Sequence, residues 1–545
     1  VESSIGILTV ETADEPPEAP AALSVATENT DVTLSWTPSS STDVTRQLIY
    51  RSVTADFDTS GARLQTVAAD VSEGTDPALA PGTYFYRVAA VDGAGNTSAR
   101  SEAAGAISTQ ITRSFGEAAS DQDYRLVALP GQADRSLAST LDGPAGTNWQ
   151  AWWDTGADAD FLVRFDGSDT FNFAPGRGFW LISTSDWTVE AAFPAVARSA
   201  GAASIALHDG WNIIANPLGS DVDWSAVVSA NGGALQTLWQ WDGSFSEATT
   251  FQSAAGGEAY YFLNDQGLEA LSIPTDADGA AARAASPSAH SSSSSGTSTA
   301  APMLTLQTRV VGMLTSTVRV GLHPEAAQGR DALDQVAPPH RFAGAHLTLT
   351  APGAPSAARR QHLAHEWRPH TPDGHRFKLV LRSAPGTPVQ IDAAGLDALG
   401  GQRATVINKA TGRTYSLNAQ TSFTLTPRSE ATTLGLVVGS ASFVEEAAEA
   451  ARPAEVTLRP GYPNPFSGQT TLTYALPEAA DVRVTVFDVT GRVVRTLSRR
   501  NQPAGRHRVQ WDGTNQAGQP VASGLYLVRL DALGQQHTQK ITRVR

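Results

Sequence analysis

The histidines of this 545-residue sequence gather in one region, and a metal site is the chemistry that such a group could support. Seven of the eleven lie between His323 and His375, most densely in His362-Leu-Ala-His365-Glu366-Trp-Arg-Pro-His370. A zinc-protease helix needs two histidines four residues apart, with a glutamate beside the first, so that both ligands share one face. Here the spacing is three, the glutamate follows the second histidine, and two nearby prolines would break a helix. The run therefore predicts histidines on a surface loop, and a non-specific metal-binding site is the alternative.

Carboxylates are also clustered, and their oxygens could hold calcium. The members of this cluster are Asp154, Asp158, Asp160, Asp166 and Asp169. Their spacing differs from that of a calcium-binding loop. We therefore expect solvated turns and no cofactor, with a structural calcium ion as the alternative.

Patterns typical of nucleophilic or nucleotide chemistry are missing from the sequence. The chain contains no cysteine, which excludes a thiolate nucleophile, a thiolate metal site and disulfides. It also contains no GxSxG turn, phosphate loop or dinucleotide fingerprint. The sequence therefore predicts a protein that is not an enzyme.

Tryptophans form a further group, because nine of the twelve lie between Trp149 and Trp241. Exposed aromatic rings can stack on sugar rings, so this group could bind a glycan. Rings that recur at matching positions of a repeat are more simply explained as core residues. We expect most of the group to be buried, and we single out Trp152 and Trp153 as candidates for glycan stacking.

The charge is uneven along the chain, whose formal net charge is −15. Residues 1–280 contain 37 acidic and 11 basic residues, whereas residues 454–545 contain 6 acidic and 12 basic residues. An acidic body opposes nucleic-acid binding, because neutralising phosphates requires a basic surface. The basic last segment could bind an anionic partner. The simpler interpretation is that its basic side chains lie on a solvated β-sheet surface.

Short segments alternate between apolar and polar residues with period two, and Gly, Pro, Asn and Asp separate them. This pattern predicts an all-β fold, a string of antiparallel β-sandwich modules. No run of about 18 apolar residues occurs, so we expect no transmembrane segment.

The first module, residues 19–109, contains three motifs that belong together. These are the strand around Trp36, the segment Leu79-Ala-Pro-Gly-Thr-Tyr-Phe-Tyr-Arg-Val88 and the turn Asp92-Gly-Ala-Gly-Asn96. With them the segment resembles a fibronectin type III domain. The resemblance implies two antiparallel sheets, with Trp36 and the alternating Tyr84 and Tyr86 filling the space between them.

The next segment, residues 110–275, is a tandem β repeat with units at about 110–198 and 199–275. Three stretches match between the units: Tyr124–Pro130 with Trp211–Pro217, Phe165–Gly167 with Trp241–Gly243, and Gly178–Leu181 with Ala259–Phe262. Each Asp-Gly pair suits a tight hairpin turn. We therefore expect two similar β units side by side.

The remaining boundaries follow from composition. Residues 1–18 are expected to be the end of a preceding domain with a Pro-rich linker, and the Ala/Ser-rich residues 276–302 a flexible linker. Residues 303–440 are expected to form a β-sandwich, and the Ala/Glu-rich residues 441–453 a connector. Strands of this sandwich are predicted at 304–311, 316–322, 345–350, 377–383, 404–408 and 434–438.

The last segment, residues 454–545, carries several motifs in a fixed order: Tyr462-Pro-Asn-Pro-Phe466, Asp488-Val-Thr-Gly-Arg492, Trp511-Asp-Gly513, Ser523-Gly-Leu-Tyr526 and the basic Lys540-Ile-Thr-Arg-Val-Arg545. With these motifs it resembles the sorting domain of type IX secretion cargo, and also the flagellar hook-capping type of Ig-like domain. The resemblance implies an Ig-like fold. It assigns the sorting function to Pro463, Asn464, Pro465, Gly491, Arg492, Trp511, Asp512, Gly513, Gly524, Tyr526 and Lys540.

The same resemblance implies export across a Gram-negative outer membrane by the type IX secretion machinery. Removal of the tail, with attachment to an anionic outer-membrane glycolipid or release, would follow. We therefore expect the non-catalytic C-terminal region of a secreted or cell-surface protein, with spacer or adhesion modules before the sorting tail. Two alternatives remain: a glycan-binding surface protein, and the accessory half of a secreted hydrolase whose catalytic domain lies upstream of Val1.

Overall fold

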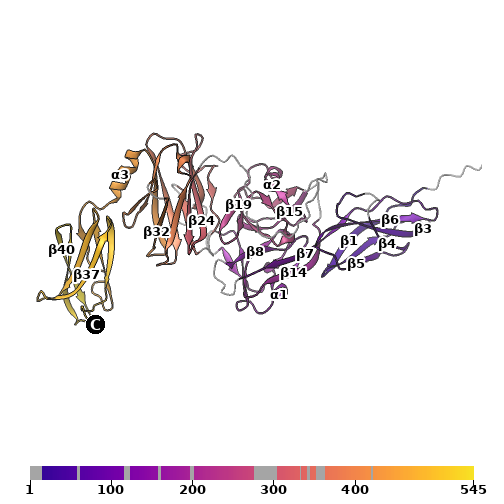
Figure 1. Ribbon diagram of the computed structural model, residues 1–545. Helices are drawn as coiled ribbons and strands as arrows, with labels where there is room; N and C mark the ends of the chain where they lie inside the picture. Colours follow the sequence, from indigo (N-terminus) through magenta and orange to yellow (C-terminus); the bar gives the residue numbers. More distant parts are fainter. Residues whose placement is uncertain are drawn as a thin grey trace, which may run out of the picture. The chain divides into compact units, whose positions relative to one another are not determined.

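The computed structural model describes residues 15–57, 62–115, 123–157, 161–196, 202–274, 303–331, 333–339, 344–351, 362–418 and 421–544. The chain divides into two compact units, residues 1–296 and 297–545. Antiparallel strands dominate both units, which confirms the predicted all-β fold of sandwich modules (Figure 1). The flexible linker predicted at 276–302 lies outside the described residues, as do residues 1–14 of the predicted preceding domain.

The first unit begins with a sandwich of two antiparallel sheets. One sheet has the order β1-β2-β5, from β1 (Ala21–Glu28), β2 (Asp31–Thr37) and β5 (Glu73–Asp76). The other has the order β14-β7-β6-β3-β4, from β3 (Val44–Ser52), β4 (Ala62–Ala68), β6 (Gly82–Asp92), β7 (Ala104–Arg113) and β14 (Trp187–Pro194). Trp36 and Tyr86 are buried in one core, as the resemblance implied, and the indole Nε1 of Trp36 donates to Gln47 Oε1 at 2.8 Å.

Strand β7 takes part in two structures at once. Its residues 104–108 pair with β6, and its residues 106–113 pair with β14. Because β14 lies in the first predicted repeat unit, the sheet crosses the boundary that the sequence placed at residue 109. The sandwich and the repeat are therefore joined by backbone hydrogen bonds as well as by the chain.

The two predicted repeat units have the same strand order. In the first, the order is β11-β10-β13-β8, from β8 (Arg125–Ala128), β10 (Trp149–Asp154), β11 (Leu162–Arg164) and β13 (Gly178–Ser183). In the second, it is β19-β18-β21-β16, from β16 (Gly210–Ile214), β18 (Leu238–Trp241), β19 (Phe245–Ala248) and β21 (Tyr260–Asn264).

The smaller elements also recur in both units. The pair β9 (Arg135–Ser136) and β12 (Asn172–Phe173) corresponds to β17 (Val222–Asp223) and β20 (Thr250–Phe251). Helix α1 (Leu137–Thr140) corresponds to α2 (Trp224–Ala230), and η2 (Asp169–Phe171) to η3 (Ala254–Gly256). The pair β7 and β14 corresponds to β15 (Ala202–Ala206) and β22 (Ala270–Pro274).

The second unit begins with a large sheet of order β31-β30-β33-β28-β26-β27-β24-β23-β29-β32, with β25 paired to β27. Each of the six strands predicted between 303 and 440 is present. The elements are β23 (Leu304–Val310), β24 (Met313–Leu322), β25 (Gln335–Val336), β26 (Ala345–Thr350), β27 (His362–Arg368), β28 (Gly374–Ser383), β29 (Val389–Ala394), η5 (Leu396–Leu399), β30 (Arg403–Asn408), β31 (Thr414–Ser416), β32 (Ser422–Leu425) and β33 (Ala431–Gly439).

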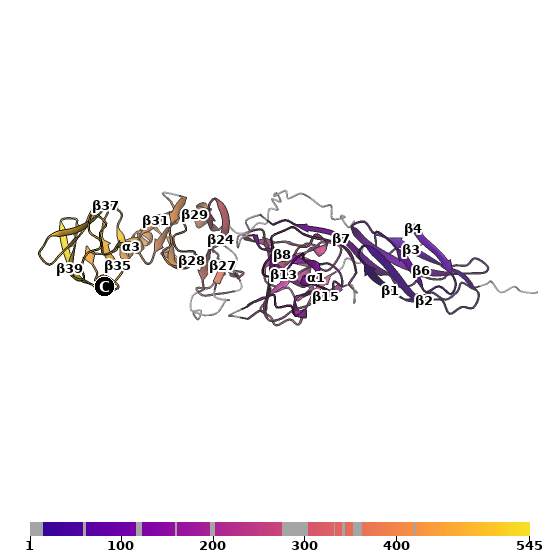
Figure 2. The same cartoon turned by 90° about the horizontal axis from the view of Figure 1, so that it is seen from below.

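The last domain follows helix α3 (Ala441–Ala451), which Ser440 caps by accepting from Phe443 N at 3.3 Å. One sheet has the order β34-β35-β38, from β34 (Thr457–Leu458), β35 (Thr470–Leu476) and β38 (Gly505–Trp511). The other has the order β37-β36-β39-β40, from β36 (Ala480–Phe487), β37 (Val493–Gln502), β39 (Gly524–Ala532) and β40 (Gln535–Arg543). Both sheets are visible in Figure 2.

No helix in the described part of the chain is both long enough and apolar enough to cross a membrane.

Candidate functional site

The histidine-rich run is a strand, so the predicted surface loop is wrong. Residues 362–368 form β27, which lies between β24 and β26. His365 is 7% exposed, and Arg319 Nη1 donates to its Nε2 at 2.8 Å. Burial, with the nearby Arg319 charge, lowers the pKa of His365 to about 3, so the ring is neutral. A strand inside a sheet can hold such side chains when they find hydrogen-bonding partners.

The described histidine and carboxylate side chains that were considered as metal ligands do not form a common site. Glu366 is 1% exposed and forms an ion pair with Arg368 on the same strand. Asp154 is buried, and its carboxylate accepts from the Tyr261 hydroxyl and from Gly156 N, both at 2.9 Å. Asp158 and Asp160 lie outside the described residues. Within the described ranges, no three His, Asp or Glu side chains form a group that could hold a metal ion.

Trp152 and Trp153 are both half-buried. The indole Nε1 of Trp152 donates to the Tyr124 hydroxyl at 3.1 Å. Trp153 packs against the core of the first repeat unit, and its ring centre lies 5.8 Å from the ring of His208 and 5.8 Å from the Arg177 guanidinium. Both rings are therefore held by neighbours within the chain.

The motif Tyr462–Phe466 covers one edge of the four-stranded sheet in the last domain. The Asn464 side chain accepts from Thr542 N at 2.8 Å and donates to Lys540 O at 3.1 Å. Phe466 N donates to Thr542 O at 3.0 Å, and Val544 N donates to Phe466 O at 2.8 Å. Pro463 and Pro465 flank these contacts and have no N–H that would need a partner. The outer edge of β40 is thus paired with the chain's own segment.

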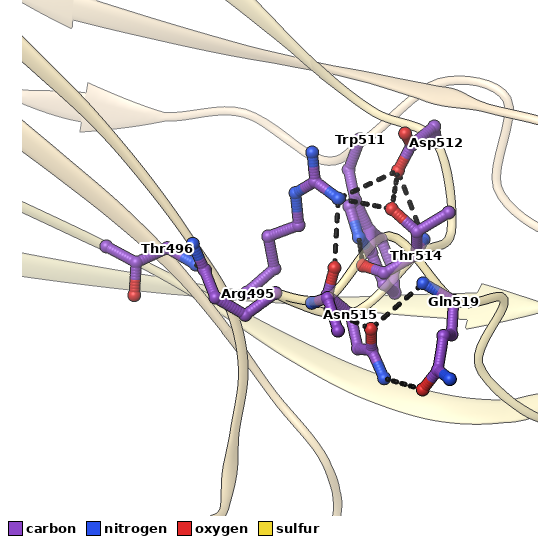
Figure 3. Close-up of polar contacts among 9 residues, drawn as sticks. Arg495, Thr496, Trp511, Asp512, Thr514, Asn515 and Gln519 are labelled. Carbon is purple, nitrogen blue, oxygen red and sulfur yellow. Dashed lines mark hydrogen bonds and ion pairs between the residues drawn. The ribbon is translucent and has the colours of Figure 1, made fainter.

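The loop that begins at Trp511 covers the opposite edge, which belongs to β37. Gln516 N donates to Val494 O at 2.9 Å, and Gln516 Oε1 accepts from Thr496 N at 3.1 Å. Arg495 points from β37 into this loop, where its Nη1 donates to the Thr514 hydroxyl and to Asn515 O (Figure 3). Both edges of the sheet are therefore capped at the same end.

The Trp511-Asp-Gly513 turn is fixed by its own hydrogen bonds (Figure 3). The indole Nε1 of Trp511 donates to Thr514 O at 2.9 Å. Asp512 Oδ1 accepts from the Thr514 hydroxyl at 2.6 Å and from Thr514 N at 3.1 Å, and these bonds lower the pKa of Asp512. Gly513 has φ of 69°, the left-handed region that glycine enters without strain.

The hairpin from Asp488 to Arg492 is built in a similar way. The Asp488 carboxylate accepts from the Thr490 hydroxyl at 2.6 Å and from the Arg492 backbone N at 3.0 Å and side-chain Nε at 3.1 Å. The hydrogen bond from Thr490 is the largest cause of the lowered pKa of Asp488. Gly491 has φ of 83°, which again suits glycine.

The remaining predicted residues divide between core and surface. Tyr526 is buried, its hydroxyl donates to Ala522 O at 2.6 Å, and its ring centre lies 5.2 Å from that of Trp511. Gly524 and Lys540 are exposed. The structure therefore brings Asn464 beside Lys540 and Trp511 beside Tyr526, while Gly491 and Arg492 lie in a separate hairpin. Most of the residues predicted for sorting therefore form the turns, cover the sheet edges or fill the core of the last domain.

Some exposed apolar residues of this domain were missed by the sequence analysis. Val489, Val493 and Leu525 are 68%, 54% and 40% exposed. The alternation in β39 could have indicated Leu525, because Leu525 and Leu527 occupy positions that are expected to be polar.

Comparison with known protein families finds an Ig-like domain in the last segment of the chain. Residues 464–536 match the family model of the FlgD Ig-like domain. No curated protein matches the chain.

Parts of the chain are also similar to solved structures. Pectate lyase Pel3 from Pectobacterium carotovorum is 24% identical over 16% of this chain and 26% of the lyase, with a TM-score of 0.15. An Fn3-like protein from Clostridium thermocellum is 21% identical over 16% of this chain and 90% of that protein, with a TM-score of 0.15. PorZ from Porphyromonas gingivalis, described as an essential surface component of its type IX secretion system, is 20% identical over 26% of this chain and 16% of PorZ, with a TM-score of 0.14.

These likenesses are local, since the match spans about a quarter of the length of the pectate lyase. With TM-scores this low, they carry no argument about function. The chain is thus a multidomain all-β protein in which residues 464–536 match the FlgD Ig-like domain.

Proposed function

We propose that this chain is a non-catalytic part of a secreted or cell-surface bacterial protein, in which residues 454–545 act as a type IX sorting tail. The preceding β modules act as spacers or adhesion modules. The protein works outside the cell or on the outer-membrane surface of a Gram-negative bacterium. Its partners are the type IX secretion machinery and, after export, an anionic outer-membrane glycolipid or an extracellular glycan.

The observation that carries this proposal is the independent core of the last domain. Seventeen buried residues between Val456 and Ile541 form one hydrophobic cluster, in which Trp511 and Tyr474 are among the largest side chains. The motifs of the sorting-domain resemblance define the turns and edges around this core. A domain with its own core can be recognised as a unit and removed without exposing the core of another module.

The packing of the tandem repeat supports a spacer role for the preceding modules. Trp180, Trp187 and Trp211 are almost fully buried, and Trp152 and Trp153 are held by neighbours. Aromatic rings that stack on sugars need an exposed face. The alternative of glycan binding through these rings therefore has no specific observation in its favour.

The test compares the full chain with a chain that ends after residue 453. Both carry an epitope tag and an inner-membrane export signal ahead of Val1, and both are expressed in a Gram-negative bacterium with an active type IX system. We expect the full chain outside the outer membrane and the shortened chain in the periplasm. If both are retained in the periplasm, or both leave it equally, the sorting role is wrong.

A further inference from the structure

Histidine, threonine and cationic side chains gather on one face of three neighbouring strands in the second unit. The strand register places His346 of β26 opposite Arg382 of β28, and Thr350 of β26 opposite His362 of β27. Opposite residues of antiparallel strands share a face of the sheet, and so do alternate residues of one strand. We call this group the histidine face, and its members are His346, Thr348, Thr350, His362, Lys378 and Arg382.

Two polar groups of the histidine face have no hydrogen-bond partner among the described residues. The Thr350 hydroxyl is shielded from solvent and makes no hydrogen bond. The Thr348 hydroxyl lies 3.2 Å from Nδ1 of His362. When this hydroxyl donates, the proton of the neutral ring is on Nε2, which has no partner in the described ranges. Because an unpaired buried polar group is costly, the Thr350 hydroxyl and the His362 N–H are donors in need of an acceptor.

The cations beside these donors have no counter-charge. Lys378 and Arg382 are exposed. Lys409 joins them, because its Nζ would lie 3.1 Å from a Cβ on Gly435, the residue of β33 that pairs with Lys378. In the part of the chain that the structure describes, no carboxylate forms an ion pair with any of these three cations. The histidine face therefore carries an uncompensated positive charge.

The other charged residues on the same side of β27 and β28 are already engaged. Arg376 lies over the Phe443 ring of α3, at 4.9 Å from its centre. Glu366 is 1% exposed and is paired with Arg368. These residues neither neutralise the histidine face nor add to its charge.

The two histidines of this face report the same positive surroundings. Burial lowers the pKa of His362, and the charges of Arg382 and Lys378 lower it further. Burial, with Arg382 and His362, lowers the pKa of His346 to about 3. Among the described carboxylates, none contributes to either shift. Such surroundings repel a metal ion and attract an anion.

We propose that the histidine face binds an oxyanion, whose oxygens accept from the Thr350 hydroxyl, His362 Nε2 and the Arg382 guanidinium, with Lys378 beside them. The oxyanion is a carboxylate, sulfate or phosphate group. A free inorganic ion and an acidic sugar both supply this chemistry, and the test separates them. The inference is independent of the proposed sorting function, because all of these residues lie outside 454–545.

The test is calorimetric titration of the full chain at constant ionic strength, since salt screens exposed charges. The probes are sodium sulfate, sodium phosphate, a uronic-acid oligosaccharide and a neutral oligosaccharide of the same length. We expect at least one anionic probe to bind at a single site and the neutral one not to bind. Arg382→Gln should weaken binding about tenfold, because it removes a hydrogen bond between charged groups. Arg483→Gln, which removes the same charge from an exposed arginine of β36, is the matched control and should bind like the unaltered chain.

Thr350→Val separates ligand binding from folding. It replaces an unpaired buried hydroxyl by a methyl group of similar size, so it should leave the melting temperature of the free protein unchanged or raise it. It should also weaken anion binding several-fold. A residue with a purely structural role would not show this combination.

The possible outcomes are distinct. Binding of sulfate or phosphate supports a site for a free anion, and binding of the uronic-acid probe alone supports a site for an acidic glycan. If no anionic probe binds, the site is wrong. It is also wrong if Arg382→Gln and Arg483→Gln weaken binding equally, or if Thr350→Val binds as tightly as the unaltered chain. Melting curves of the purified variants show that each one folds.

Discussion

The indole Nε1 of Trp180 donates a hydrogen bond to the Tyr261 hydroxyl at 3.0 Å, although the two residues hold the same position in the two repeat units. The backbone contacts nearby are reciprocal. Ala128 N donates to Gly257 O at 3.3 Å, and the equivalent Ala215 N donates to Gly176 O at 2.9 Å. The units therefore meet through one surface used twice, as in a two-fold symmetric dimer. The repeat is a single packed body in which each unit covers the other.

The first prediction concerns the hydrogen-bond relay at this contact. Tyr261 accepts from Trp180 and donates to the buried carboxylate of Asp154 at 2.9 Å. Tyr261→Phe removes both bonds inside the protein and should lower the free energy of unfolding by about 1–3 kcal/mol. Tyr84→Phe is the control, because it removes an exposed bond to Ala80 O and should cost less than about 1 kcal/mol. Denaturant unfolding measures both, and equal costs would contradict the relay.

The second prediction concerns two glycines of the first repeat unit. Gly156 and Gly167 have φ of 77° and 85°, so both are in the left-handed region. A Cβ on Gly156 would lie 2.0 Å from Asp209 O in the second unit, whereas a Cβ on Gly167 would meet nothing within 4 Å. Gly167→Ala should cost about 1 kcal/mol through backbone strain alone, and Gly156→Ala at least about twice that. Comparable losses in thermal melting would show that the units do not approach this closely.

The third prediction concerns the covered edge of β40. Asn464→Ala removes the side-chain bonds to Thr542 N and Lys540 O and should expose part of this edge. Because an exposed edge pairs with other chains, light scattering should detect association that the unaltered protein lacks. Asn408→Ala removes two similar bonds, from Ala410 N and Thr411 N, within a hairpin turn away from this sheet. If both variants associate to the same extent, edge exposure is not the cause.

The fourth prediction concerns pH. The pKa of His365 in the folded chain is lowered to about 3, so folding favours the neutral ring. Its contribution to stability is complete above the unfolded pKa of about 6.5 and is lost as the pH falls from there toward 3. His365→Gln should reduce the slope of unfolding free energy against pH in this range by up to about 1.4 kcal/mol per pH unit. An unchanged slope in His365→Gln would overturn this account.

The sequence predicted the fold well where the period-two pattern was strong. The strands around Trp36 and Leu434–Val438 alternate or are continuously apolar, and both were found. Strand β27 was missed because His362, His365 and Glu366 are polar, and only pairing on both sides makes such a strand favourable. The shared role of β7 could not be predicted either, since it depends on contacts between residues far apart in the sequence.

The candidate site was only partly accessible from the sequence for a related reason. Motif matching selects residues that a fold requires, and Asn464, Trp511 and Asp512 prove to be residues of edges and turns. Val493 belongs to no motif, and only the strand register shows that it lies opposite Phe487.

The central claim is that residues 454–545 are a sorting signal for export. Peptide mapping of the native protein from fractionated host cells tests this claim most directly. The account predicts that the protein lies outside the outer membrane and that peptides of the sorting domain, such as those containing Trp511 and Lys540, are missing from it. Recovery of these peptides in a protein that stays inside the cell would contradict the account, and the last domain would then be an ordinary Ig-like structural module.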